Sequence, residues 1–221
     1  LGEEIEDAVK KLAGKYFEDL KWEVVRNMIL DDRTRLDGRK LDDIRSLIDS
    51  ASYTYIRQRE MKGLGHAILT GRELVGDEPF AVVLADDLCV NEERGVLAQM
   101  VELYKQFRCS IVAVQEVPET ETHKYGVIAG EMIKDDIFRI DSMVEKPEPG
   151  TAPSNLAIIG RYILTPDIFE LIENTEPGKG GEIQITDALM QQAQSGCVIA
   201  YKFKGQRFDC GSVEGYIEAT N

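Results

Sequence analysis

Three aspartates are the first candidates for chemistry in the sequence. Asp86 and Asp87 directly follow the apolar run FAVVLA, and Asp209 leaves a short strand-like run just before Gly211. Carboxylates at the end of a buried strand suit a hard cation such as Mg²⁺, which binds one or two carboxylates together with phosphate oxygens. The alternative for the Asp86–Asp87 pair is a solvated turn or a helix cap. Their place at the carboxyl end of a strand favours a metal site, with Asp209 as a further candidate ligand.

Glu145 and Lys146 form the next candidate pair. They end the predicted strand 137–145, and Pro147 stops it. The glutamate can accept hydrogen bonds from sugar hydroxyls, and the lysine can place a positive charge against a phosphate. An isolated Glu-Lys-Pro is more often a surface turn, so the pair alone does not identify a site for a sugar phosphate.

The segment RQREMKGLGHAIL supplies a candidate site for a base. Gln58 ends a predicted strand, and Gly63 and Gly65 open a predicted helix. A side-chain amide beside exposed glycine backbone can read the hydrogen-bonding edge of a flat base, because glycine lets the ring approach closely. A single G-x-G is a weak signal, and on spacing alone an ordinary strand-to-helix turn is favoured.

These candidates need a scaffold, and from Tyr53 onward the sequence predicts alternating strands and helices. Runs rich in Val, Ile, Tyr and Phe predict strands at 53–58, 80–85, 109–116, 125–129, 137–145, 157–164 and 197–203. Helical spacing of apolar residues predicts helices at 65–76, 94–107, 165–174 and 182–195. Two of the strands are apolar nearly throughout, as in strands covered on both faces. We therefore predict an α/β fold with a doubly wound, mostly parallel sheet, and ligands beyond the carboxyl ends of its strands.

The N-terminal part has a different composition. Residues 1–50 contain no strand-like run, and their apolar residues recur at helical spacing. A short helical segment is therefore expected to precede the sheet. We divide the chain into this segment, residues 1–42, and an α/β domain, residues 43–221.

Composition excludes several classes of function. The 221 residues include 40 acidic and 26 basic side chains, a net charge of −14, which argues against broad electrostatic binding of nucleic acid. A local basic or backbone-amide pocket can still bind an anionic small molecule. The four cysteines form no C-x-x-C pair, so neither structural zinc nor a disulfide framework is expected. No apolar run is long enough to cross a bilayer and no signal peptide opens the sequence, which predicts a cytoplasmic protein without a membrane partner.

Seven motifs in a fixed order carry a family resemblance. They are KGLGHAIL, VVLADD, KYGVI, VEKP, APSNLAIIGRYIL, GEIQITDAL and FDCGSVEGY. Together they closely resemble the bacterial UTP–glucose-1-phosphate uridylyltransferases, members of the sugar-nucleotidyltransferase family with a Rossmann-like fold. The resemblance covers about residues 43–221.

The resemblance implies a role for each candidate residue. In chain order these are uracil recognition by Gln58 and Gly63, Mg²⁺ binding by Asp86 with Asp209, glucose contact by Gly126 and Glu145, and phosphate contact by Lys146. Lys146 and Asp86 are the implied catalytic residues. The implied reaction converts UTP and glucose-1-phosphate to UDP-glucose and pyrophosphate with Mg²⁺ as cofactor. It depends on alignment and charge neutralisation rather than acid–base catalysis, because the attacking phosphate oxygen is already ionised near neutral pH.

The sequence departs from the family before Tyr53. Family members begin with a strand and a Gly-rich loop of the G-x-G-T-R type around the triphosphate, and no such motif occurs here. The domain is expected to lack that N-terminal nucleotide-binding unit and a C-terminal helix. Instead, residues 24–45, with RLDGRKLDDIR, resemble a linker segment of polynucleotide phosphorylase.

Two functions remain open from the sequence. One is a uridylyltransferase, whose turnover is expected to be slow without the triphosphate loop. The other is a non-catalytic chimeric or remnant domain that binds a sugar nucleotide. Pyrophosphate release from UTP and glucose-1-phosphate distinguishes them, and a homo-oligomer is compatible with either.

Overall fold

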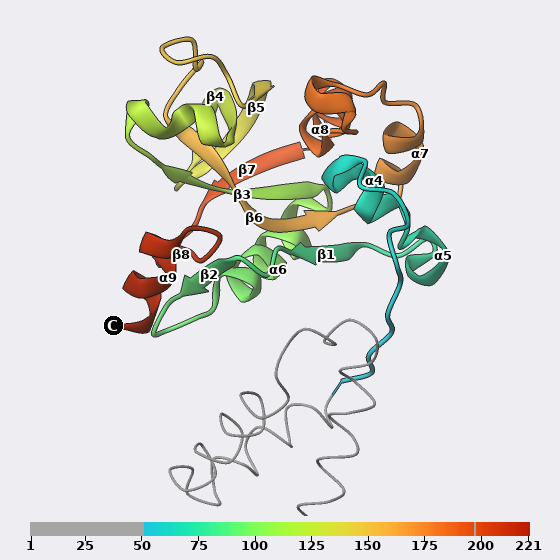
Figure 1. The fold of residues 1–221 in the computed structure, drawn as a ribbon, viewed down its shortest axis with the longest axis horizontal. Helices are drawn as coiled ribbons and strands as arrows, with labels where there is room; N and C mark the ends of the chain where they lie inside the picture. The colour runs from blue at the N-terminus through green and yellow to red at the C-terminus, as the bar shows by residue number, and fades with distance from the viewer. Residues whose placement is uncertain (1–50, 197) are drawn as a thin grey trace, which may run out of the picture. The chain divides into compact units, whose positions relative to one another are not determined.

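The computed structural model describes residues 51–196 and 198–221 (Figure 1). The predicted helices before residue 50, the proposed boundary at residues 42–43 and the segment resembling polynucleotide phosphorylase lie outside the described residues. Contacts within the chain separate Leu1–Tyr55 from Ile56–Asn221 as two units. The second unit holds all the described helices and strands.

Helices and strands alternate along this second unit, which confirms the α/β class. The strands are β1 (Phe80–Val83), β2 (Asp87–Val90), β3 (Ser110–Glu116), β4 (Gly126–Lys134), β5 (Ile137–Glu145), β6 (Leu156–Leu164), β7 (Val198–Lys202) and β8 (Gln206–Asp209). The α-helices are α4 (Gly63–Leu69), α5 (Arg72–Val75), α6 (Val96–Phe107), α7 (Ile168–Glu173), α8 (Ile185–Gln194) and α9 (Val213–Thr220), and the 3₁₀-helices are η2 (Glu119–Lys124) and η3 (Lys179–Gly181).

The main sheet has six strands in the order β1-β6-β3-β7-β5-β4, and β4 also pairs with β6. The prediction of a mostly parallel sheet is wrong for these strands, because β3–β7 is the only parallel pairing among those described. β6 runs antiparallel to both β1 and β3, and β4 and β5 form a hairpin. A continuous run of apolar residues indicates that both faces of a strand are covered. It does not indicate whether neighbouring strands run parallel or antiparallel.

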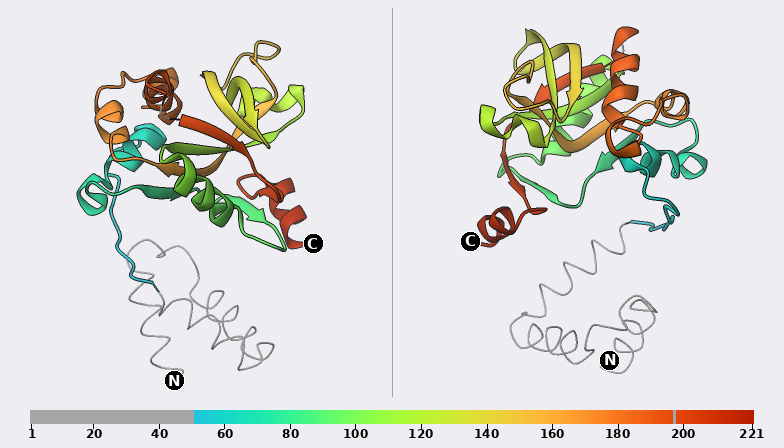
Figure 2. Two further views of the ribbon diagram at one scale, coloured as in Figure 1. Left: turned by 180° about the vertical axis from the view of Figure 1, so that it is seen from behind. Right: turned by 45° about the horizontal axis from the view of Figure 1, so that its top comes forward.

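Both faces of the sheet are covered, as the apolar strands predicted. Alternate side chains of β3 enter two separate cores: Val112 and Val114 pack in the core with α4, α7 and α8, and Ile111 and Ala113 pack in the core with α6. Figure 2 shows α6 lying across one side of the sheet. Within the described residues no helix is long and apolar enough to span a bilayer.

Two local predictions differ from the structure. The predicted strand 53–58 is not a strand, and Tyr53 and Tyr55 are 60% and 86% exposed. Its aromatic and β-branched residues favour extended backbone, but a strand also needs a neighbour to pair its amides and carbonyls, and no described strand pairs with it. The short strand β2 was not predicted; it pairs antiparallel with β8, so that Asp87 lies opposite Asp209.

Candidate active site

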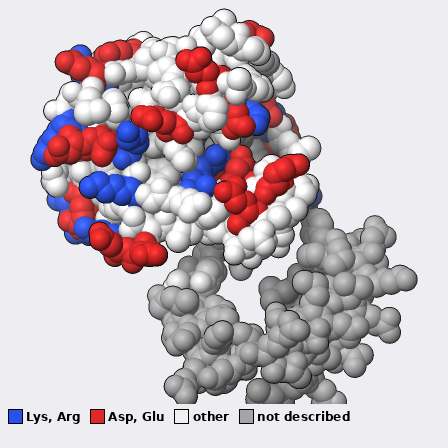
Figure 3. Space-filling model, turned by 90° about the vertical axis from the view of Figure 1, so that its left-hand side faces the viewer, with Lys and Arg blue, Asp and Glu red and all other residues white. Residues whose placement is uncertain are grey.

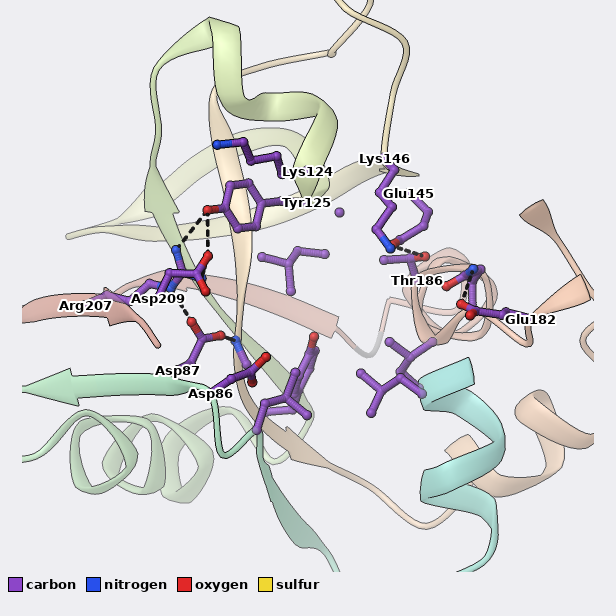
Figure 4. Close-up of a pocket in the computed structure, with 18 residues that line it drawn as sticks. Asp86, Asp87, Lys124, Tyr125, Glu145, Lys146, Glu182, Thr186, Arg207 and Asp209 are labelled. Atoms are coloured by element: carbon purple, nitrogen blue, oxygen red, sulfur yellow. Dashed lines mark hydrogen bonds and ion pairs between the residues drawn. The ribbon is translucent and has the colours of Figure 1, made fainter. Parts of the chain in front are cut away.

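A cavity of about 330 Å³ is lined by most of the candidate residues. Figure 4 shows its polar side chains in two groups, one around Asp86 and Asp209 and the other around Glu145 and Lys146. The residues lining it come from segments far apart in the sequence, and they include Leu64, Asp86, Asp87, Lys124, Tyr125, Gly126, Glu145, Lys146, Tyr162, Glu182, Thr186, Arg207 and Asp209. Five of the seven predicted site residues are therefore brought together at one cavity.

Asp86 and Asp209 lie side by side, although 123 positions separate them in the sequence. A Cβ atom placed on Gly211 would lie 3.2 Å from both Oδ2 of Asp86 and Oδ1 of Asp209. The two carboxylates therefore face one small space that glycine leaves open. The structure brings these two candidate ligands together, and their role in binding a cation stays a prediction.

The β2–β8 ladder brings these segments together. Asp87 and Asp209 are register partners in it, and the backbone amide of Cys210 donates to the carbonyl oxygen of Asp86 over 2.7 Å. The described residues contain no group of three or more His, Cys, Asp or Glu suited to a metal ion. Two carboxylates fit Mg²⁺ well, because this ion usually keeps several waters and takes its remaining ligands from substrate phosphates.

Asp87 is occupied by protein groups. Its Oδ2 accepts a hydrogen bond of 2.7 Å from the Gly160 amide, and its Oδ1 forms an ion pair with Nε of Arg207. A Cβ on Gly160 would lie 2.6 Å from that Oδ2, so glycine is needed for the contact. Asp87 is 6% exposed, and it is therefore a buried counter-ion rather than an open ligand.

Arg207 links Asp87 to Asp209 and Tyr125. Its Nη2 lies 3.2 Å from Oδ2 of Asp209, its Nη1 donates to the Tyr125 hydroxyl over 3.2 Å, and its guanidinium lies 5.0 Å from the Tyr125 ring centroid. Burial works against the charge of Arg207, but the hydrogen bond with Tyr125 and the ion pair with Asp87 outweigh it and raise the pKa of the guanidinium. Figure 4 shows this chain of contacts on one side of the cavity.

Glu145 occupies the other side of the cavity. Its Oε2 accepts a hydrogen bond of 3.1 Å from the hydroxyl of Thr186, in the first turn of α8. A Cβ on Gly126 would lie 2.8 Å from Cγ2 of Thr186 and 3.0 Å from Oε2 of Glu145, so glycine is needed here too. Burial raises the pKa of the Glu145 carboxyl, and the Thr186 hydrogen bond and the Lys146 charge oppose that shift.

Lys146 lines the cavity and has an unusual backbone conformation. Its φ is +45°, in the left-handed region that few residues other than glycine adopt. Its amide donates to the Tyr125 carbonyl over 3.0 Å, which fixes the end of β5. Its Nζ lies 3.8 Å from Oε1 of Glu145, and the side chain is half exposed. The ammonium is therefore available to an anionic ligand that enters beside Glu145.

Gln58 and Gly63 do not line this cavity. The Gln58 amide nitrogen contacts the Gly63 carbonyl at 3.2 Å and Nδ1 of His66 at 2.9 Å. Gly63 has a φ of +84°, and a Cβ there would lie 2.8 Å from Cβ of Glu182. Close packing and backbone conformation therefore account for this glycine, while its neighbour Leu64 does line the cavity.

Sequence reasoning assigned no role in the site to Tyr125, Thr186 or Arg207, and it left Asp87 as a possible ligand. Tyr125 and Thr186 lie within the motifs KYGVI and GEIQITDAL. The sequence gives the order of these motifs, but it does not show which residues they contact. Gly160 carried a local signal, because a glycine inside an otherwise apolar strand often marks a close backbone approach. Arg207 had no such signal, since its partners are distant in the sequence.

The charges around the site are mixed. Figure 3 shows acidic and basic side chains interspersed on the face it presents, with no continuous basic area over the described residues there. The cavity lining itself combines carboxylates with Lys124, Lys146 and Arg207. Such a lining suits a ligand that has both phosphates and neutral hydroxyls.

Comparison with known proteins gives one consistent family. The sequence model of the nucleotidyl transferase family matches residues 26–221. A UTP–glucose-1-phosphate uridylyltransferase of Pseudomonas aeruginosa strain PAO1 is 80% identical over 179 residues, 80% of this chain and 64% of the relative. The enzyme of that name from Bacillus subtilis strain 168 is 44% identical over 202 residues, 91% of this chain and 68% of the relative.

Solved structures agree in fold. A UDP-glucose pyrophosphorylase complexed with UDP-glucose is 56% identical with a TM-score of 0.81, over 88% of this chain and 76% of that one. A UTP-bound enzyme of this kind from Acinetobacter baumannii is 34% identical with a TM-score of 0.70, over 86% of this chain and 68% of that one. The chain spans 64% of the length of the Pseudomonas relatives it matches. It belongs to the nucleotidyl transferase family.

Proposed function

We propose that this chain transfers a uridylyl group from UTP to glucose-1-phosphate, forming UDP-glucose and pyrophosphate, with Mg²⁺ as cofactor. One observation carries the proposal: a carboxylate pair suited to a cation and a carboxylate suited to sugar hydroxyls face the same cavity. The high identity to UTP–glucose-1-phosphate uridylyltransferases supports the choice of UTP and glucose-1-phosphate.

The proposed reaction is an in-line displacement at phosphorus. A phosphate oxygen of glucose-1-phosphate forms a bond to the α-phosphorus of UTP, and the bond from that phosphorus to the bridging β-phosphate oxygen breaks. Pyrophosphate leaves with the electron pair, and no proton has to be removed from the nucleophile at neutral pH. The protein therefore contributes alignment and charge neutralisation, which dominate phosphoryl chemistry.

Asp86 and Asp209 are the proposed ligands of Mg²⁺. Their oxygens face one space beside Gly211, while Asp87 is held by Arg207 and Gly160. Mg²⁺ bound there would neutralise charge on the phosphates. Asp86 is exposed, so its carboxylate is open to a phosphate-bound cation.

Glu145, Gly126 and Lys146 are proposed to bind glucose-1-phosphate. The Glu145 carboxylate has one oxygen bonded to Thr186, and its other oxygen lies 3.8 Å from Nζ of Lys146. Sugar hydroxyls are hydrogen-bond donors that such a carboxylate can accept, and the lysine is suited to the adjacent phosphate. Because Gly126 has no side chain, the cavity wall beside Glu145 stays open.

Gln58 and Gly63 are proposed to recognise uracil from the N-terminal side of the cavity. Gly63 directly precedes Leu64, which lines it, and the Gln58 amide contacts the Gly63 carbonyl. Gln58 is held in place through its amide nitrogen, and no described residue donates to its amide oxygen.

We also propose a cytoplasmic location, where UTP and sugar phosphates are available.

The test is turnover of UTP and glucose-1-phosphate by the chain with Mg²⁺, measured as pyrophosphate and UDP-glucose formed in equal amounts. Asp209→Asn should lower the rate by about 10²–10³-fold, the usual effect of removing one charge-stabilising group. Asp141→Asn is the matched control, because Asp141 is 58% exposed and contacts Arg139 at 3.6 Å. Binding of UDP-glucose without turnover would instead support a sugar-nucleotide-binding domain.

A further inference from the structure

Asp209 has its two oxygens in different environments. Oδ2 accepts a hydrogen bond of 3.2 Å from the Tyr125 hydroxyl and lies 3.2 Å from Nη2 of Arg207. Among the described residues, Oδ1 accepts a hydrogen bond from the Gly211 amide alone, at 3.2 Å, and it faces the space shared with Asp86. One oxygen is therefore held by the protein, and the other is directed at the proposed cation position.

The direction of these hydrogen bonds is fixed by chemistry. Arginine can only donate, so the Tyr125 hydroxyl accepts from Nη1 of Arg207 and must use its single proton toward Asp209. The same guanidinium uses Nε on Asp87. Arg207 thus donates hydrogen bonds to Asp87 and Tyr125 and forms an ion pair with Asp209, and its side chain is only 9% exposed.

The carboxylates of Asp86, Asp87 and Asp209 lie close together at the end of the β2–β8 ladder, and their contacts with Arg207 differ. Without a cation between them, Asp87 and Asp209, which are opposite each other in the β2–β8 register, would repel. The fork of the guanidinium neutralises Asp87 and orients Asp209 through its two ion pairs. Within the described part of the chain, Asp86 and Oδ1 of Asp209 are then the carboxylate groups that face the shared space. A lysine has one ammonium and cannot reproduce this fork.

We propose that Arg207, acting with Tyr125, is a positioning residue for the cation site: it holds Asp209 so that Oδ1 faces Asp86, and it keeps Asp87 from acting as a ligand. The inference rests on the proposed function, because the cation site is part of that proposal. Partners that orient a metal ligand typically contribute 10–100-fold to metal affinity.

The test is Mn²⁺ binding to the full chain, followed by the loss of the free Mn²⁺ electron paramagnetic resonance signal. Arg207→Lys and Tyr125→Phe both keep the net charge, so a change in affinity reports geometry and not electrostatic attraction. We expect Arg207→Lys to weaken Mn²⁺ binding by about 10–100-fold and Tyr125→Phe to weaken it by about 3–10-fold, in line with the net contribution of one typical hydrogen bond.

Matched controls exist at the C-terminal end of α6. Arg108 lies over the Tyr104 ring, 5.6 Å from its centroid, and neither residue lines the cavity. Arg108→Lys and Tyr104→Phe therefore repeat the same chemical changes and should leave Mn²⁺ affinity unchanged. Circular dichroism checks that each variant is folded at the temperature of the titration, and Tyr125→Phe remains informative if Arg207→Lys does not fold.

Wild-type affinity for Mn²⁺ in folded Arg207→Lys and Tyr125→Phe would overturn the inference and leave Arg207 as a stabilising ion pair only. Absence of Mn²⁺ binding to the unaltered chain would overturn it as well. Titration with UDP-glucose in the presence of EDTA tests the proposed function separately. Failure there, with altered Mn²⁺ binding in the two variants, would overturn the substrate assignment and not the role of Arg207.

Discussion

Gly126→Ala is the substitution whose effect the structure defines most closely. The new methyl group would lie 2.8 Å from Cγ2 of Thr186, 3.0 Å from Oε2 of Glu145 and 3.3 Å from Cδ1 of Ile158. Thr186 is 2% exposed and Ile158 is 7% exposed, so neither can move freely. Glu145, which is less buried, is the group expected to give way.

The magnitude follows from overpacking. Extra methyl groups in a well-packed interior cost about 1–3 kcal/mol. A chain of this size loses about 2–4 °C in Tm per kcal/mol, so thermal unfolding should shift downward by about 2–12 °C. Displacing the Glu145 carboxylate removes a hydrogen bond to a charged group, about 1.5–3 kcal/mol, and should weaken UDP-glucose binding by about 10–100-fold.

Calorimetry measures both quantities, by thermal scanning and by titration with UDP-glucose. Gly95→Ala is the control, because a Cβ on Gly95 meets nothing within 4 Å and its φ is −53°. It should bind UDP-glucose as the unaltered chain does. If Gly126→Ala keeps its Tm within 1 °C and its affinity within about twofold, the close packing of Gly126, Thr186 and Glu145 described above is wrong.

Three further outcomes are expected. Lys146→Ala should weaken glucose-1-phosphate binding and leave glucose binding little changed in a titration; equal losses would contradict separate roles for Lys146 and Glu145. Because burial raises the pKa of Glu145, UDP-glucose affinity should fall on acidification through a pH above 4.5. Thr186→Val removes the hydrogen bond that lowers the pKa of Glu145, so the pH at which UDP-glucose affinity falls should move upward. A shift of that pH downward would refute this. EDTA should abolish pyrophosphate release, and added Mg²⁺ should restore it. Release that persists in EDTA would contradict a cation site at Asp86 and Asp209.

The sequence predicted the local parts of the fold well. β5 matches its predicted range, 137–145, and α6 and β6 differ from theirs by one or two residues. These elements have long apolar patterns whose period identifies them without knowledge of their neighbours. Strand pairing is different, since β6 lies between β1 and β3 in an antiparallel arrangement that no local pattern encodes.

The site shows the same division. Asp86 and Asp209 were recognisable because each stands at the end of an apolar or strand-like run. Arg207 was not, because its role depends on Asp87 and Tyr125, which are distant in the chain and come near it only in the folded structure. The strand predicted at 53–58 fails for a related reason: propensity favours extended backbone there, but pairing decides whether a strand forms.

The β2–β8 ladder also has a consequence for the order of folding. The sugar side of the cavity depends on the β4–β5 hairpin, whose strands are joined by a two-residue turn with Asp136 at a φ of +64°. The cation side needs Asp87 to meet Asp209, which closes a loop of more than a hundred residues. Closing so long a loop has a large entropic cost and is slow. Backbone amides of the hairpin should therefore gain protection from hydrogen exchange earlier in refolding than those of β2 and β8, so that the cation site is completed last.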